Sequence, residues 1–404
     1  MSLISDIKSK DKKGLFASDD NFVNYSTGNL ALDYANGFWQ DVKLPDGTIT
    51  QIPVLGIIGG TNVCIIGETG AGKTTFADDM AYNIIKPYPN GVMIHVDCEK
   101  TLIKQRVVRT TGVNWDDERV ILNKEKTSIE DVLAQFNEIC EMKESLGKAC
   151  MYEVKNLSYD GKSFWVYEPT VFVIDALPSF NSSKMDDEGM GTNMDAAIAC
   201  KHISRFYNNT IDRMIKYNIT IIWINHIRPD VVADPYAAPP KGLMMLRKGE
   251  TLPRGRTAQY LTQNFFRINM KRSDAYTKED DGFTGFHADI QVAKSKTNMV
   301  GSIVPVTFNA AVGFEPIFSL YEFGKSLGLI QGRNPNLYFE GLDAFKFSRK
   351  NFVKKMKSEK QFFDGVMGVL TPYLESLLGS KELNEDEKVH LADIKWGEDS
   401  EGQD

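Results

Sequence analysis

The sequence lacks several features that would mark a membrane, secreted or metal-binding protein. In its 404 residues no apolar run approaches the roughly 20 residues that a membrane-spanning helix needs. The N-terminal stretch has no signal-peptide pattern and soon becomes rich in lysine. The five cysteines are odd in number and have no spacing typical of a metal site. We therefore expect a cytoplasmic protein without a membrane partner, whose cysteines are reduced and mostly buried.

Positive charge is also in short supply, because 47 Lys and Arg residues face 54 Asp and Glu residues, for a formal net charge of −7. This balance argues against a generally basic nucleic-acid-binding protein. It leaves room for one whose basic residues are confined to a groove or a loop. The length allows one large domain plus a smaller one.

The phosphate-binding pattern G-x-x-x-x-G-K-[ST] occurs in the segment Gly67-Glu68-Thr69-Gly70-Ala71-Gly72-Lys73-Thr74, which Thr75 follows. An apolar run precedes this segment and an amphipathic stretch follows it, which predicts a strand, a glycine turn and a helix. Backbone N–H groups and the helix dipole then converge on one point, where they bind phosphate. Lys73 would reach the β- and γ-phosphates, and the Thr74 hydroxyl would hold Mg²⁺.

Three further predicted strands end in polar residues at the same sheet edge. These strands, at 91–96, 171–174 and 219–224, lead into Glu99, Asp175 and His226. Ligands of parallel α/β sheets bind beyond the carboxyl ends of the strands. Asp175 has the form of a Walker B acid that faces Mg²⁺. A lone histidine is usually structural, so the sequence leaves open whether His226 senses the bound nucleotide.

The remaining elements are predicted from periodicity and turn residues. Hairpins are expected around Pro45-Asp46-Gly47 and around Tyr159-Asp160-Gly161-Lys162. Helices are expected at 101–109, 128–145 and 195–217, strands at 265–270, 288–293 and 305–308, and a helical pattern from about Ser319.

A long segment, 229–257, is predicted to be irregular and is mostly positive in charge. Its basic residues include Lys241, Arg247, Lys248, Arg254 and Arg256. Loops this long inside a compact domain are usually functional or disordered. A basic loop with methionines and a tyrosine suits the phosphates and stacked bases of a nucleic acid. A solvated surface loop is the alternative.

With these segments in place, the chain resembles the RecA family of recombinases, in particular its phage-encoded UvsX-type members, from about Tyr25 to Leu378. The likeness is carried by the P-loop and by Ser26-Thr27-Gly28-x-Leu30-x-Leu32-Asp33, Asp97-x-Glu99, Val173-Ile174-Asp175, Ile224-Asn225-His226 and Lys294-x-Lys296. It implies an α/β fold: a RecA-type P-loop ATPase core with a mostly parallel central sheet over residues 25–318. An N-terminal arm (1–24, a candidate subunit-assembly segment), a small C-terminal α/β domain (319–380) and an acidic disordered tail (381–404) complete the implied organisation.

The resemblance also implies roles for individual residues. It makes Glu99 the residue that orients or deprotonates the attacking water, and His226 the sensor of the γ-phosphate. Lys294 and Lys296 would reach the nucleotide of the adjacent subunit.

The bound ATP would lie on the P-loop, and Thr74 and Asp175 would hold its Mg²⁺. Arg106 is the candidate for the adenine-stacking position. The two DNA-binding loops would fall at about 180–192 and 229–257. The two predicted hairpins look like insertions into the family pattern.

The implied function is that of an ATP-dependent DNA recombinase. Such a protein is a DNA-dependent ATPase that self-assembles as a helical filament on single-stranded DNA and exchanges strands with homologous duplex DNA. Its further partners would be single-strand-binding and loading proteins, and its compartment the host cytoplasm if it is phage-encoded.

Two alternatives remain open. A hexameric RecA-fold helicase or translocase would use the P-loop, Glu99 and Asp175 equally, although the lysine pair and the C-terminal domain favour the recombinase. An ATP-binding regulatory or mediator protein without strand exchange is the third interpretation.

Overall fold

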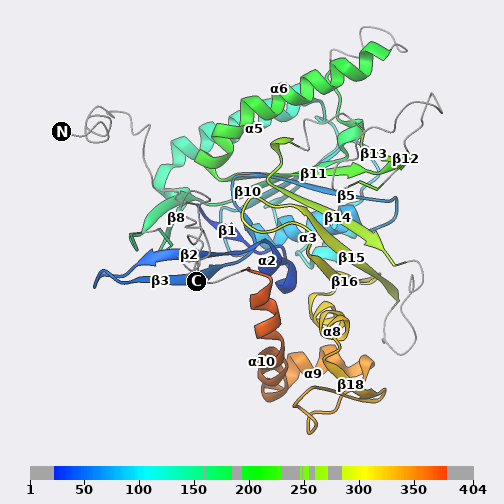
Figure 1. Cartoon of the computed structure of the whole chain (residues 1–404). Coiled ribbons are helices and arrows are strands. Elements are labelled where there is room, and N and C mark those ends of the chain that lie inside the picture. The colour runs from blue at the N-terminus through cyan, green and yellow to red at the C-terminus, as the bar shows by residue number, and fades with distance from the viewer. Residues whose placement is uncertain are drawn as a thin grey trace, which may run out of the picture.

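The computed structural model describes residues 22–155, 157–158, 160–183, 193–229, 246–247, 249–253, 260–271 and 284–379. These residues form an α/β core, with two projecting hairpins and a smaller region at the C-terminal end of the chain (Figure 1). The expected N-terminal arm (except for its last residues), the acidic tail and most of both expected DNA-binding loops lie outside the described residues. What the sequence predicts for them stays a prediction.

The core is built on one nine-stranded sheet in the described part of the chain, with the strand order β17-β16-β15-β14-β5-β11-β10-β6-β7. The strands are β5 (Asn62–Gly67), β6 (Val92–Asp97), β7 (Val120–Asn123), β10 (Thr170–Asp175), β11 (Ile219–His226), β14 (Asn264–Met270), β15 (Gly285–Lys294), β16 (Ile303–Asn309) and β17 (Gly313–Phe314). Neighbours run parallel from β7 to β14 and antiparallel from β14 to β17. The sheet is therefore mostly parallel, as the sequence predicts.

Both faces of the sheet are covered, which explains why its central strands read as continuous apolar runs. Every residue of β5 and β10 is buried. Successive side chains point to opposite faces, so Val173 joins one hydrophobic cluster and Ile174 the other.

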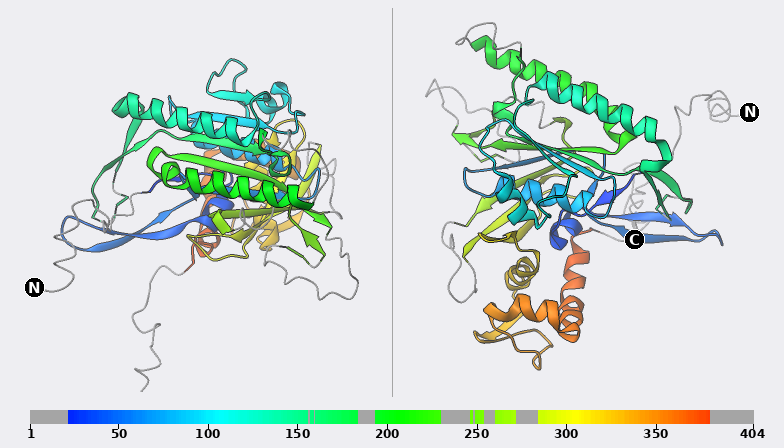
Figure 2. Two further views of the ribbon diagram at one scale, coloured as in Figure 1. Left: turned by 90° about the horizontal axis from the view of Figure 1, so that it is seen from above. Right: turned by 180° about the vertical axis from the view of Figure 1, so that it is seen from behind.

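The described helices lie on these two faces and in the C-terminal region (Figure 1). They are α2 (Leu30–Asn36), α3 (Lys73–Ile85), α4 (Lys104–Thr111), α5 (Ile129–Leu146), α6 (Asn193–Tyr217), α8 (Pro316–Ser326), α9 (Phe352–Ser358) and α10 (Lys360–Ser376). Short 3₁₀ turns occupy Gly147–Cys150, Leu177–Ser179 and Arg349–Asn351. Helices α5 and α6 lie side by side over one face (Figures 1 and 2), while α3 packs on the other. On the α5–α6 face Trp223 of β11 stacks on Tyr207 of α6, with ring centroids 4.6 Å apart.

The two predicted hairpins are confirmed. One consists of β2 (Phe38–Lys43) and β3 (Ile49–Val54), and the other of β8 (Met151–Val154) and β9 (Phe164–Tyr167). Gly47, with φ +89°, makes the turn of the first. The loop of the second reaches the first, because a Cβ on Gly161 would lie 3.0 Å from the Lys43 carbonyl oxygen.

The C-terminal region joins the core through α8, which packs on β16. This helix begins at Pro316, earlier than expected, because proline is favoured in the first turn of a helix. The expected helical pattern is also interrupted by a hairpin of β18 (Ile330–Arg333) and β19 (Asn336–Phe339). Gly332, with φ +87°, lies within this hairpin. A group of aromatic rings, Phe339, Phe347, Phe352 and Phe362, fills the interior.

Three details correct the sequence prediction. Strand β7 was not expected, because it is short and only partly buried at the sheet edge. Helix α4 begins at Lys104 rather than at Thr101, because Ile103 is its N-cap and has an extended backbone, with φ −115° and ψ 137°. The N–H groups of Thr101 and Leu102 bond to Asp97. The segment 229–257 is not wholly irregular, since β12 (Arg228–Pro229) pairs with β13 (Glu250–Thr251).

All five cysteines are free, and Cys64, Cys140 and Cys150 are buried. No helix among the described residues is both long and apolar enough to cross a membrane.

The last two-stranded pairing, β1 (Asn24–Tyr25) with β4 (Ile57–Ile58), ties the start of the described chain to the core.

Candidate nucleotide-binding site

The P-loop connects β5 to α3 through two glycines in left-handed conformations. Gly70 has φ +81° and Gly72 has φ +83°, a region that favours glycine. Gly72 is also the N-cap of α3 and supplies no side chain to cap its first turn. The N–H groups of that turn therefore face the loop, where an anion can bind them.

Lys73 and Thr75, both just after Gly72, are suited to bind a phosphate. Lys73 is buried, and its Nζ donates to the Glu68 carbonyl oxygen at 2.8 Å. Burial lowers the pKa of this lysine, while Asp175 and Glu99 oppose the shift. Thr75 is 1% exposed, and its hydroxyl has no hydrogen-bond partner in the described structure. A buried polar atom of this kind is costly unless something bonds it, and a nucleotide phosphate would do so.

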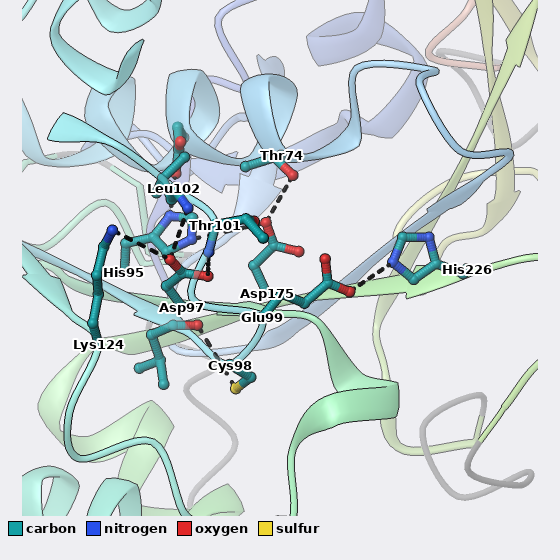
Figure 3. A network of polar contacts seen from close by, with 12 residues as sticks. Thr74, His95, Asp97, Cys98, Glu99, Thr101, Leu102, Lys124, Asp175 and His226 are labelled. Atoms are coloured by element: carbon teal, nitrogen blue, oxygen red, sulfur yellow. Dashed lines mark hydrogen bonds and ion pairs between the residues drawn. The ribbon is translucent and has the colours of Figure 1, made fainter. Parts of the chain in front are cut away.

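The pair Thr74 and Asp175 fits a magnesium ion. Thr74 Oγ1 donates to Asp175 Oδ2 at 2.7 Å, which brings a hydroxyl and a carboxylate together at the ends of α3 and β10 (Figure 3). Burial raises the pKa of Asp175, while His95 and the Thr74 bond oppose the rise. Mg²⁺ is usually held by one or two protein oxygens plus substrate phosphates and water. The described residues contain no cluster of three or more His, Cys, Asp or Glu side chains suited to a metal.

Glu99 lies at the same edge of the sheet, just beyond β6. The register of the parallel strands places Asp97 beside Asp175, and Gly67 beside His226. Glu99 Oε1 lies 3.3 Å from His226 Nε2 (Figure 3). Burial lowers the pKa of His226, as does Lys73, which favours the neutral imidazole near neutral pH. The sequence predicts that the P-loop, Glu99, Asp175 and His226 meet at this edge, and they do. Their catalytic roles stay predictions.

Asp97 holds the Glu99 segment in place. Its carboxylate accepts from the N–H groups of Leu102 at 2.8 Å and Thr101 at 3.3 Å. Lys124 Nζ lies 3.8 Å from the same carboxylate. Lys100, which lies between Asp97 and Thr101, has φ +56°, a conformation that is unfavourable for a residue with a side chain. The bonds to Asp97 stabilise the turn in this conformation.

A buried histidine in β6, His95, escaped the sequence analysis. Its Nδ1 lies 2.6 Å from Asp78 Oδ1 of α3, and its Nε2 lies 3.9 Å from Asp175 Oδ2. Burial by itself lowers the pKa of His95, but Asp78, Asp175 and Asp97 together raise it above its ordinary value. A polar residue inside an apolar strand was the available signal, because a buried polar group needs a partner.

Lys294 and Lys296 do not join this site within one subunit. Lys294 ends β15, where it pairs with Phe265 near the start of β14, whereas Gly67 pairs with Ile268 farther along that strand. The Lys294 backbone is therefore about 10 Å back along the strand direction and two strands away from Gly67. Lys294 Nζ donates to the Tyr260 carbonyl oxygen at 2.9 Å, and Lys296 lines a separate pocket with Leu378 and Gly379.

Among the five predicted DNA-binding residues, the structure describes only Arg247; Lys241, Lys248, Arg254 and Arg256 lie outside the described residues. Arg247 is exposed and shares a pocket of about 320 Å³ with Glu68 of the P-loop, Asn269 and Met270.

The segment 229–257, called the basic segment below, is attached to the core through β13. Glu250 of β13 accepts from Arg267 Nη1 at 2.6 Å and Nη2 at 2.7 Å, and Arg267 is 2% exposed. Sequence analysis missed this pair, since neither residue stands out locally.

Arg106, the candidate for adenine stacking, is exposed in the first turn of α4. The same helix approaches the P-loop helix, because a Cβ on Gly313 would meet both the Thr110 carbonyl oxygen, at 2.9 Å, and Thr75. Arg106 thus lies on an element next to the P-loop helix, and its role stays a prediction.

Comparison with known proteins agrees with this geometry. Residues 48–200 match a protein-family model described as ATPase: KaiC. This range is less than half of the chain and contains the P-loop, Glu99 and Asp175. No curated protein matches the chain. The match contains nothing specific to UvsX-type recombinases or to phage proteins. It identifies a KaiC-like ATPase domain, and with the mostly parallel sheet it shows that this chain has the RecA-type P-loop ATPase fold.

Proposed function

We propose that this ATPase is a DNA recombinase, which assembles on single-stranded DNA as a helical filament and exchanges strands with a homologous duplex. The observation that carries the proposal is the position of the Lys294–Lys296 pair. Both lysines lie away from the P-loop of their own subunit. If they act on phosphate, they act on the phosphate of a neighbour, and hydrolysis then depends on assembly.

The surface around these lysines supports contact with a second copy of the chain. Met299, in the segment that joins β15 to β16, is 72% exposed, and Ile303, the first residue of β16, is 59% exposed. Tyr260, whose carbonyl oxygen accepts from Lys294, is 64% exposed. Large apolar side chains beside a cationic pair fit a subunit interface in which the lysines face a phosphate.

The chemistry assigned to each residue follows from its position. Lys73 and the first turn of α3 bind the phosphates, and a magnesium ion on Thr74 and Asp175 would neutralise their charge. Glu99 orients or deprotonates the attacking water as a general base. Lys294 and Lys296 of the next subunit stabilise the charge that develops on the γ-phosphate.

DNA binding is coupled to the nucleotide through β11. His226 contacts Glu99, and two residues farther along the chain Arg228 begins β12, which pairs with the base of the basic segment. A change at the γ-phosphate therefore has a short route to the residues that would bind DNA. ATP binding would favour the DNA-gripping geometry, and hydrolysis would release the strand.

Electron microscopy of the protein with single-stranded DNA and a slowly hydrolysed ATP analogue tests this proposal. We expect extended helical filaments that disassemble when ADP replaces the analogue. Closed rings would favour the hexameric helicase or translocase. ATP hydrolysis that DNA does not stimulate would favour the regulatory or mediator protein.

A further inference from the structure

His95 is a polar residue where the fold otherwise places apolar ones. It lies within β6, in the run Val92–Asp97, and it is 0% exposed. Its neighbour in the sheet is Val173 of β10, two residues before Asp175. Since side chains alternate along strands, the imidazole points to the same face as Asp175, towards α3.

The two ring nitrogens have different surroundings. Nδ1 is within hydrogen-bond distance, 2.6 Å, of Asp78 Oδ1, and the Asp78 side chain is only 2% exposed. Nε2 is buried without a hydrogen-bond partner in the described structure, and it lies 3.9 Å from Asp175 Oδ2. One nitrogen is thus held by α3, and the other is directed at the carboxylate that pairs with Thr74 (Figure 3).

We propose that His95, anchored by Asp78, is a positioning residue for Asp175. The ring fixes Asp175 so that its carboxylate stays beside Thr74, in the orientation that a metal ion requires. Residues behind a metal ligand commonly act in this way, and their loss typically weakens metal binding by about 10- to 100-fold. The inference depends on the ATPase core and not on strand exchange.

A purely structural role is the competing explanation, because the His95–Asp78 pair also joins α3 to β6. The two explanations differ in which ring nitrogen matters. An asparagine amide can occupy the place of Nδ1 and bond Asp78, but it is too short to reach Asp175. A glutamine amide can occupy the place of Nε2 and face Asp175. His95→Asn and His95→Gln therefore separate the two contacts.

The experiment measures Mn²⁺ binding to the ADP complex of the full chain by electron paramagnetic resonance of the free ion. We expect His95→Asn to weaken Mn²⁺ binding by about 10- to 100-fold. His95→Gln should stay within a few-fold of the unmodified protein. ADP binding without metal should be unchanged in both. Neither DNA nor a filament is needed, so the result is independent of whether the recombinase proposal holds.

Wild-type Mn²⁺ affinity in a folded His95→Asn protein would overturn the inference, as would equal weakening by both substitutions. If either histidine variant does not fold, Asp78→Asn answers the same question. This change keeps an acceptor for Nδ1 and removes the charge that anchors the ring. We expect it to weaken Mn²⁺ binding at least several-fold, and unchanged binding would again refute the positioning role.

Discussion

Replacing Glu250 by glutamine should detach the basic segment from the core. The Glu250 side chain is 17% exposed and that of Arg267 is 3% exposed, and they form two short hydrogen bonds. Glu250 also accepts from the backbone N–H of Arg247 at 2.7 Å. Removing one partner of a buried ion pair costs about 3–5 kcal/mol, because the other charge stays buried without its counter-ion. Arg267 Nε still donates to Asn269 Oδ1 at 2.8 Å, which offsets part of this cost. We expect a loss of about 3 kcal/mol, at the lower end of that range, since glutamine retains one acceptor oxygen.

Asp289→Asn is a matched control on β15, the strand that pairs with the Arg267 strand β14. Asp289 pairs with Lys271 at 2.9 Å, but the two side chains are 28% and 33% exposed. A pair this open to solvent contributes less than about 1 kcal/mol. The two proteins therefore differ mainly in the burial of the ion pair that is broken.

Urea denaturation gives the change in the free energy of unfolding, and hydrogen exchange at residues 249–253 reports whether the loss is local. Glu250→Gln should lower the free energy of unfolding by about 3 kcal/mol. If the loss is local, the free energy of opening at residues 249–253 should fall by that amount instead. Its affinity for single-stranded DNA should fall as well, because Arg247 loses its support. A Glu250→Gln protein as stable and as protected as Asp289→Asn would refute the reasoning.

Four further predictions concern the site, the proposed interface and the fold. Lys73→Ala should abolish ATP hydrolysis, and Glu99→Gln should retain nucleotide binding while slowing turnover by about 10²- to 10⁴-fold; equal turnover in a steady-state assay would move the general base elsewhere. Changing both Lys294 and Lys296 to alanine should leave ATP binding intact and reduce DNA-stimulated turnover, and mixing with Glu99→Gln should restore part of it. No recovery at any mixing ratio would contradict action in trans. Replacing Arg247, Lys248, Arg254 and Arg256 by alanine should flatten the slope of log affinity against log salt by about 0.7 per lost phosphate contact, and an unchanged slope would make the segment a solvated loop. Burial raises the pKa of Asp33 to about 6 although Ser26 and Thr27 donate to it. The folded chain then binds a proton that the unfolded chain releases near pH 4, so this group lowers the free energy of unfolding as pH rises to about 6. Asp33→Asn should remove that slope from urea titrations between pH 4 and 6.

The parts of the fold that the sequence predicts are those whose signals are local. The P-loop turn depends on Gly70 and Gly72, whose left-handed conformations suit glycine. Asp175 is the last residue of a fully buried strand, and the turn residues around Gly47 predict a hairpin. Each of these signals lies within a few residues of the structure that it specifies.

The parts that escaped prediction depend on contacts between distant segments. His95 and Asp78 are 17 residues apart and meet only because α3 packs across β6 and β10. Glu250 and Arg267 are also 17 residues apart, with residues 254–259 outside the described structure between them. In both pairs the partner is set by strand register and helix packing, which no local pattern of residue types records.

A strand-exchange assay measures the activity proposed for this ATPase. Fluorescent duplex DNA is mixed with protein-coated single-stranded DNA, and transfer of the labelled strand is followed with ATP, with Lys73→Ala protein as the control. We predict ATP-dependent transfer to a homologous strand and none to a heterologous one. ATP-dependent separation of the duplex without regard to homology, or no transfer by a protein that hydrolyses ATP on DNA, would contradict the account.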